Sequence, residues 1–488
     1  MFWRGLWGYL PANILQGVIG FATLTVFTRI LSPDDYGRYA LAMGVSSLAQ
    51  TLFFTWIEAA MARFYPAESL KNTEAPRLYG TLYRMFVVVT VLFALACGLG
   101  LWLWPAETEG AKALKLAIGC GLGAVVFRSL IKMVQEQRRS AGRVGPASVI
   151  DMVQTAGGFG FGVWLAMLGL GGGSPLLGVA IIAALTLPFV VWEDWGRALK
   201  GRFDKRRARI YAAYGFPVAA SLILTLILYT IDRFLIAHFL DEAQAGAYHA
   251  GYSLASRILD VLFIWFGAAG GPAMVYALEN NGLEGLKTAA REQINTMALV
   301  LFPAVGGLIM VAPPLAELLI GKGLRAQALS ITGIISIGAL FSGLNTYYFL
   351  QAFTLSKKTK LLILAMSVPA VANITLNLLF IPMWGLWGAG LATALSFAIG
   401  LTASWLIGLK TLALPVPFWN LTRIAAATLV MMGVLYFMPA WGGIIELVVK
   451  GVTGVAIYAC LALLFNLNGV RDLGHRIGQR LFKRLGAG

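Results

Sequence analysis

Two pairs of ionisable residues stand inside long apolar stretches of this sequence. Arg128 and Lys132 are four residues apart, and Arg257 and Asp260 are three residues apart, so each pair shares one face if its stretch is helical. An Arg, Lys or Asp side chain at the centre of a bilayer costs about 2.5–3.5 kcal/mol on insertion scales. In a membrane protein these four residues are therefore the first candidates for function.

Each pair also has a purely structural interpretation. Arg257 and Asp260 can neutralise each other in an internal salt bridge, or they can act as a ligand cation tuned by a titratable carboxylate. Lys132 can reach the cytoplasmic surface by extending its side chain. Arg128 has no acidic residue close to it in the sequence. Its charge is therefore the hardest to explain without an anionic partner.

Other basic and amide side chains also lie within apolar stretches. A basic residue near the end of a stretch suits interfacial anchoring as well as substrate binding. An amide side chain can bond substrate hydroxyls, or it can hold helices together. The remaining candidates for substrate binding are Arg29, Arg63, Arg233, Asn345 and Asn373.

Three acids are candidates for coupling transport to an ion gradient, namely Asp260, Glu58 and Asp151. Each lies within an apolar stretch, where a carboxylate needs a function or a partner. Glu58 and Asp151 can titrate, or they can pair with Arg63 or Arg143. The three cysteines show no metal-ligand spacing, and we expect neither a metal nor a cofactor.

The elements that must position these residues are membrane helices. Of 488 residues, 59% are hydrophobic and 12% are charged, whereas soluble chains carry about 25% charged residues. Mean hydropathy is +0.77. The apolar stretches are continuous rather than alternating, which favours helices over a barrel. At roughly 20 residues per crossing, we expect an all-α integral membrane protein with about fourteen transmembrane helices. Their approximate cores are 8–30, 39–62, 82–104, 114–135, 147–169, 175–195, 213–238, 247–275, 295–320, 327–353, 361–384, 386–409, 420–439 and 443–466.

The net charge of +16 reflects membrane topology and not a nucleic-acid surface. Basic residues gather in every second connection and in the tail, whereas the intervening connections carry few. This alternation follows the positive-inside rule. It predicts a multi-pass protein with both termini in the cytoplasm. The basic segments are 71–84, 138–143, 197–209, 357–360 and 471–484.

A short acidic turn occurs twice. TRILSPDDYGRYAL, residues 28–41, returns in degenerate form as HFLDEAQAGAYHA, residues 238–250, with Gly37 aligned on Gly246. In the first copy Ser32 can cap a helix and Pro33 can begin it. The repeat predicts two lobes with the same orientation in the membrane. The expected parts are an N-lobe (1–196, helices 1–6), a basic cytoplasmic linker (197–212), a C-lobe (213–411, helices 7–12), helices 13 and 14 (412–466) and an amphipathic basic tail (467–488).

The repeated turn also carries a family resemblance. TRILSPDDYGRYALA, together with NITLNLLFIPMWGLWGAGLATALS at 373–396, resembles the Wzx-type polysaccharide flippases. Those proteins belong to the multidrug/oligosaccharidyl-lipid/polysaccharide exporter superfamily, as do the MATE exporters and the lipid II flippases. The resemblance implies a transporter and not an enzyme. The implied substrate is an undecaprenyl-diphosphate-linked oligosaccharide, flipped across the bacterial inner membrane by alternating access for cell-surface polysaccharide biosynthesis.

The resemblance further implies coupling to a proton or sodium gradient, contact with membrane lipids, and a glycan polymerase as a candidate partner. The basic excess within the N-terminal helices suits an anionic ligand such as a diphosphate or an acidic sugar. A MATE-like exporter of small molecules is the alternative within transport. A membrane enzyme acting on the same glycans and a scaffold for their assembly are alternatives of other classes. The short outer connections, which offer few acid–base groups, argue against the enzyme.

Overall fold

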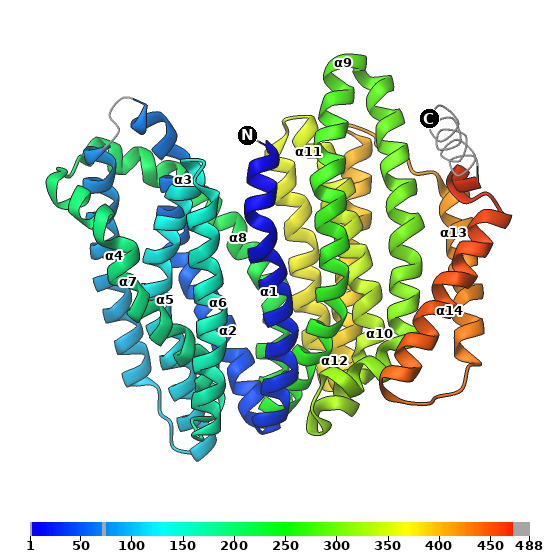
Figure 1. The fold of residues 1–488 in the computed structure, drawn as a ribbon, viewed down its shortest axis with the longest axis horizontal. Coiled ribbons are helices and arrows are strands. Elements are labelled where there is room, and N and C mark those ends of the chain that lie inside the picture. The colour runs from blue at the N-terminus through cyan, green and yellow to red at the C-terminus, as the bar shows by residue number, and fades with distance from the viewer. Residues whose placement is uncertain (1, 71–74, 472–488) are drawn as a thin grey trace, which may run out of the picture. The chain divides into compact units, whose positions relative to one another are not determined.

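The computed structural model describes residues 2–70 and 75–471, and most of them are helical (Figure 1). The described residues form no strand. The α-helices are α1 (Phe2–Ile30), α2 (Pro33–Phe53), α3 (Thr55–Ser69), α4 (Pro76–Leu103), α5 (Glu109–Ser140), α6 (Val144–Met167), α7 (Ser174–Lys200), α8 (Lys205–Phe239), α9 (Glu242–Leu319), α10 (Lys322–Leu344), α11 (Gln351–Leu355), α12 (Thr359–Leu409), α13 (Phe418–Tyr436) and α14 (Gly443–Leu464). Short helical turns occupy Gly171–Gly173, Asn345–Phe349 and Leu467–Gly469. From residue 472 onward, the predicted amphipathic tail lies outside the described residues.

Eleven helices of the described chain are long and apolar enough to cross a membrane, or twelve if α2 and α3, bent by 49°, form one span. The prediction of an all-α multi-pass membrane protein is confirmed. The number fourteen stays a prediction. Reaching it requires α9 and α12 to cross twice each, and both contain one glycine with non-helical backbone, Gly282 at φ 63° and Gly385 at φ 59°.

The chain forms two compact units, residues 1–249 (unit 1) and 250–488 (unit 2). In unit 1, α8 packs against α2, α3 and α4. Only residues 201–204 separate α7 from α8, so most of the basic segment 197–212 is helical and not an extended connector. Asp204 caps α8 by accepting from the amides of Arg206 and Arg207. The lobe boundaries inferred from the repeat remain a prediction.

Helix α5 lies in the middle of unit 1, where it packs against α2, α3 and α7, while α6 packs against α1 and α7 (Figure 1). Small residues allow α6 and α7 to approach closely. A Cβ atom on Gly178 would lie 2.2 Å from the backbone nitrogen of Gly162. This packing brings polar positions of α1, α2, α5 and α6 to one region of the unit.

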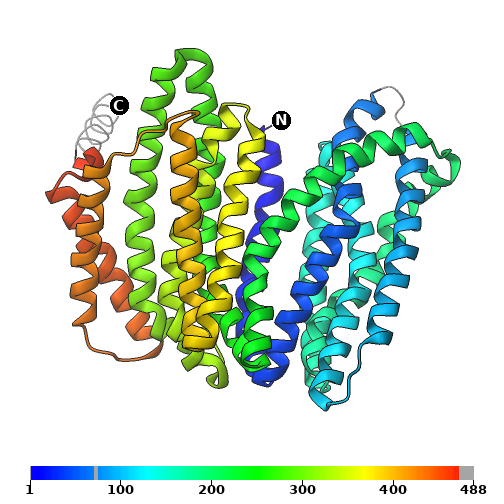
Figure 2. The same ribbon diagram turned by 180° about the vertical axis from the view of Figure 1, so that it is seen from behind.

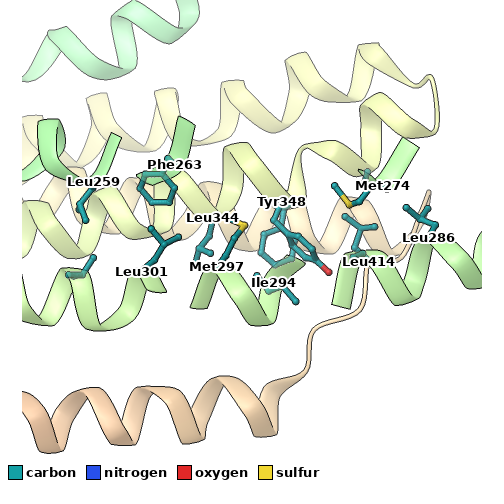
Figure 3. Packing of buried hydrophobic residues seen from close by; sticks show 14 of the residues in the cluster. Leu259, Phe263, Met274, Leu286, Ile294, Met297, Leu301, Leu344, Tyr348 and Leu414 are labelled. Atoms are coloured by element: carbon teal, nitrogen blue, oxygen red, sulfur yellow. The ribbon is translucent and has the colours of Figure 1, made fainter. Parts of the chain in front are cut away.

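Unit 2 has its own apolar core, built mainly by α9 with residues from α10 to α12 (Figure 3). Tyr348 is fully buried there, and its hydroxyl donates to the carbonyl oxygen of Pro415 at 2.5 Å. Helices α13 and α14 pack against each other beside this core (Figure 2). The core fixes the position of Asn345, which begins a single π-helical turn at Asn345–Phe349.

Candidate functional site

Unit 1 contains a polar cavity of about 410 Å³. Helices α1, α2, α5, α6 and α7 form its wall. The lining residues, which we call the unit-1 cavity, are Gln16, Ile19, Thr23, Phe27, Tyr39, Gln50, Arg128, Ile131, Lys132, Gln135, Arg139, Asp151, Gln154, Thr155, Gly158, Phe159, Pro175 and Val179. Three of the predicted site residues, Arg128, Lys132 and Asp151, therefore share one cavity.

Arg128 lines this cavity from α5, and its side chain is exposed rather than packed away. Among the described residues it forms no hydrogen bond and no salt bridge. Glu58 and Tyr39 are near enough to act on it electrostatically. Arg128 thus presents an available guanidinium fork inside a membrane helix, which is the group that best matches carboxylate and phosphate oxygens.

Lys132, one helical turn further along α5, is paired. Its Nζ lies 3.2 Å from Oε2 of Glu58, a carboxylate that is only 4% exposed. The Gln50 amide donates to the other oxygen of Glu58 at 3.3 Å. Pairing with Arg63, one alternative that the sequence left open for Glu58, is not formed, because the partner of Glu58 is Lys132 and Arg63 lies at an exposed position of α3. A buried carboxylate requires a nearby cation, and Lys132 on α5 provides it.

Asp151 on α6 is held by two partners from α5. Gln135 donates to its Oδ1 at 2.8 Å, and Arg139 donates to its Oδ2 at 2.7 Å. Arg139 also bonds Glu136 at 3.0 Å. Pairing of Asp151 with Arg143, the other alternative that the sequence left open, is not formed, because Arg143 is an exposed residue at the start of α6.

The sequence reasoning missed Gln135 and Arg139, although the sequence contains a signal for them. Arg128, Lys132, Gln135 and Arg139 follow one another at intervals of four, three and four, so they form one polar stripe on α5. Gln154, which also lines the cavity, is three residues from Asp151 and shares its face of α6. A search for polar periodicity, in place of single charges, finds these residues.

The ion pairs decide the charge that the cavity offers to a ligand. Lys132 is matched by Glu58, and Arg139 is matched by Asp151 and Glu136. Arg128 is the cation that the lining leaves unmatched within the described residues. Because ion pairs satisfy the other two cations locally, the cavity offers one strong anion-binding group.

A second cavity, of about 540 Å³, lies within unit 2 between α9, α13 and α14. Its lining is almost entirely aliphatic. The cation in its wall, Lys450, bonds Glu446 at 2.6 Å. This cavity suits an apolar chain and offers little to a sugar or a phosphate.

Residues 26–325 match the protein family described as "Polysaccharide biosynthesis protein". The chain belongs to this family. The matched region contains Arg128, the polar stripe of α5 and the α6 residues of the unit-1 cavity. The predicted resemblance to polysaccharide transporters is confirmed.

This chain is also similar to the succinoglycan biosynthesis transport protein ExoT of Rhizobium meliloti (strain 1021). The two are 25% identical over 333 residues, which are 65% of this chain and 62% of that protein. The chain thus spans less than two thirds of the length of this curated relative.

Among solved structures, the family member resembles the lipid II flippase MurJ in its inward closed conformation, with a TM-score of 0.77 and 16% identity over 95% of this chain and 99% of that one. It also resembles an inward-facing MATE family transporter of the MOP superfamily, with a TM-score of 0.62 and 14% identity over 86% and 96% of the two chains. At these identities the likeness shows the fold alone.

In this family member the other basic candidates of unit 1 lie outside the cavity lining. Arg29 is exposed in the last turn of α1, and Arg63 is exposed on α3 beside the Phe64 ring. Arg233 is buried in α8. Its neighbour Asp232 accepts a 2.7 Å hydrogen bond from the Tyr248 hydroxyl. The structure therefore does not bring these three arginines to Arg128.

Arg257 and Asp260 belong to unit 2, on α9. No salt bridge joins them within the described residues, although Arg257 acts electrostatically on Asp260. Asp260 is exposed, and Nε of Arg257 is buried without a hydrogen-bond partner. The predicted internal salt bridge is thus not formed.

The two amide candidates are buried in unit 2. Asn345 is 8% exposed and Asn373 is fully buried. Neither polar atom of the Asn373 side chain has a hydrogen-bond partner in the described chain. This burial favours packing between helices over contact with a substrate in the present conformation.

Proposed function

We propose that this member of the polysaccharide biosynthesis family is a flippase. It moves a polyprenyl-diphosphate-linked oligosaccharide from the inner to the outer leaflet of the bacterial inner membrane by alternating access, for cell-surface polysaccharide biosynthesis. The family match, the transport function in the relative's name and the fold shared with a lipid II flippase support this proposal.

One observation carries the proposal for this chain, namely the available guanidinium of Arg128 in a cavity between membrane helices. A membrane protein keeps an unneutralised arginine at considerable cost. Binding of an anionic ligand offsets that free-energy cost, because a charge-assisted hydrogen bond is strong where water is scarce. The polar cavity is the place for the hydrophilic headgroup. The basic candidates outside the cavity, including Arg29, Arg63, Arg233 and Arg257, remain proposed contacts along the path.

We propose further that transport is driven by an ion gradient, with a proton as the first ion to test. Glu58 and Asp151 each hold a cation that lines the cavity. A proton that neutralised Glu58 would release Lys132 to an incoming anion, and loss of that proton would favour its departure. Asp260 is the third proposed coupling acid, although it holds no cation of the unit-1 cavity. We also propose that both termini lie in the cytoplasm. A glycan polymerase is the proposed protein partner.

A MATE-like exporter of small molecules is the alternative, and the MATE fold likeness favours it. A site for organic cations needs unmatched carboxylates. The unit-1 cavity instead presents an unmatched cation. An Arg128→Glu variant that gained export of organic cations would favour the alternative.

The deciding experiment uses cells that lack the chromosomal gene and carry plasmid copies. Lipid-linked glycan intermediates are extracted, and the leaflet that holds them is determined by periodate accessibility in intact spheroplasts. Without the gene, the complete lipid-linked oligosaccharide should accumulate on the cytoplasmic side. The wild type should clear it, and Arg128→Gln should slow clearance at least about tenfold.

Arg84→Gln is the matched control, because Arg84 is an exposed arginine of α4 that does not line the cavity. It should behave as the wild type. Equal membrane levels of the three proteins exclude a defect of insertion. Normal clearance by Arg128→Gln would contradict the assigned site, and absence of accumulation in the deletion strain would contradict the function.

A further inference from the structure

We infer that the unit-1 cavity binds one sugar ring that carries a single negative charge, and not the diphosphate of the carrier lipid. This inference rests on the proposed function and names the part of the substrate that the cavity recognises. Three features of the lining carry it: its charge, its hydrogen-bond acceptors and its apolar wall.

The charge of the lining fits one anionic group. Lys132 is engaged by Glu58, and Arg139 is engaged by Asp151 and Glu136, which leaves Arg128 to face a ligand. A diphosphate carries its charge on two adjacent groups and is usually bound by several cations or a metal ion. A carboxylate on a sugar needs one guanidinium fork. The Asp151 carboxylate in the same wall would repel a second negative charge.

The amides of the lining present acceptors that a diphosphate cannot use. Gln50 donates to Glu58, Gln135 to Asp151, and Gln154 to the Thr186 hydroxyl. No described residue donates to the side-chain oxygens of these glutamines, and those oxygens are not sealed from the cavity. Ionised phosphate groups only accept hydrogen bonds, whereas sugar hydroxyls both donate and accept. The lining therefore matches hydroxyl groups and penalises a ligand composed of acceptors.

The internal bonds also hold these acceptors in place. Each glutamine is anchored through its Nε2 to a partner on α3, α6 or α7. Thr155 and Gln16 add further polar groups to the same wall. An array that is oriented before the ligand arrives loses little entropy on binding. Such an array recognises the positions of hydroxyls, which distinguish one sugar from another.

The apolar wall and the volume fit a ring of this size. Phe27 and Phe159 line the cavity, with their ring centroids 6.0 Å apart in an edge-to-face arrangement. Phe27 is only 1% exposed and supports the ring of Phe159 from behind, so Phe159 is the ring that offers a surface for the C–H face of a pyranose. The volume of about 410 Å³ is near the lower end of the range of about 300–1,000 Å³ for small-molecule sites. It suits one or two sugar rings and not a whole oligosaccharide.

Binding of three probes to the purified full-length protein tests this inference by isothermal titration calorimetry. The probes are methyl β-glucuronide (one negative charge), methyl β-glucoside (neutral) and inorganic pyrophosphate. The wild type should bind the glucuronide about tenfold more tightly than the glucoside, because one charged hydrogen bond is added. Pyrophosphate should not compete with the glucuronide.

Variants separate the two recognition elements. Arg128→Gln should reduce the preference for the glucuronide to less than about twofold while keeping glucoside binding. Gln154→Leu should weaken both sugars by a similar factor, since it removes an acceptor and not the charge. Arg84→Gln should bind all three probes as the wild type does. Thermal melting of each protein checks that it is folded.

Two results would overturn the inference. Tighter binding of pyrophosphate than of the glucuronide, lost in Arg128→Gln, would make this a diphosphate site and leave the proposed flippase function intact. Absence of sugar binding by the folded wild type would remove the sugar site. Failure of the flippase proposal itself shows in the leaflet assay, which does not depend on these probes.

Discussion

The Arg38 guanidinium donates from Nε to Oε2 of Glu242 at 2.6 Å, and this contact joins the two copies of the repeated acidic turn. Both residues belong to unit 1, Arg38 on α2 and Glu242 at the start of α9. Arg38 also bonds Asp35 at 3.0 Å. Gly37 and Gly246, the aligned glycines of the repeat, lie at the same contact. A Cβ on Gly246 would be 2.8 Å from the Gly37 nitrogen.

Gly37→Ala should destabilise the protein. A Cβ at this position would lie 1.7 Å from the backbone carbonyl oxygen of Glu242, and backbone cannot rotate away as a side chain can. We expect a loss of about 1–3 kcal/mol in the free energy of unfolding, measured as a lower Tm in detergent. Gly98→Ala is the control, because nothing lies within 4 Å of that Cβ. An unchanged Tm for Gly37→Ala would show that the two turns separate readily.

The Arg38–Glu242 pair should show coupling in a double-mutant cycle. Its side chains are 16% and 22% exposed, so solvent screens the pair only in part. Arg38→Gln, Glu242→Gln and the double variant should give a coupling free energy of ~1 kcal/mol, at the upper end for surface pairs. The Lys112–Glu109 pair, 57% and 90% exposed, is the control and should give nearly none. Equal values for the two pairs would refute a stabilising contact between the turns.

Local features of this fold could be predicted from the sequence. Ser32 caps α2 by accepting from the Asp35 amide, and Pro33 is its first residue, as expected. The predicted division between the runs 361–384 and 386–409 falls at Gly385, the non-helical residue of α12. These features depend on the residues themselves and their immediate neighbours, which the sequence displays directly.

Contacts between helices could not be predicted in the same way. The run 39–62 was expected to be one helix, but it is broken at Phe54, where the chain bends by 49° between α2 and α3. No proline or glycine marks that position. The bend places Glu58 against Lys132, which is 74 positions away in the sequence. Pairing between distant residues depends on how each helix is rotated, and that is set by tertiary packing.

Glu58→Gln should test the proposed coupling role. The amide imitates a permanently protonated carboxyl, so Lys132 loses its anionic partner in every state. We expect export to fall at least about tenfold and to lose its response to a collapsed proton gradient. Leaflet accessibility of the lipid-linked intermediate, followed with and without an uncoupler, provides the measurement. Asp260→Asn serves as comparison, because Asp260 is exposed and forms no salt bridge within the described chain. If only that variant lost the response, the coupling acid would be Asp260.

Asn373→Leu should distinguish a packing role from a substrate-binding role for this buried amide. Asn373 is fully buried, and neither its Oδ1 nor its Nδ2 has a hydrogen-bond partner in the described chain. Replacing an unsatisfied buried polar group by an apolar one of similar size is neutral or stabilising, by up to about 1–3 kcal/mol. We therefore expect an equal or higher Tm in detergent and normal glycan export. Asn377→Leu is the matched control one turn away, where the amide donates to the Asn373 carbonyl oxygen at 2.9 Å, and it should lower the Tm. Loss of export by a stable Asn373→Leu protein would mean that another conformation of the transport cycle exposes this amide to the glycan.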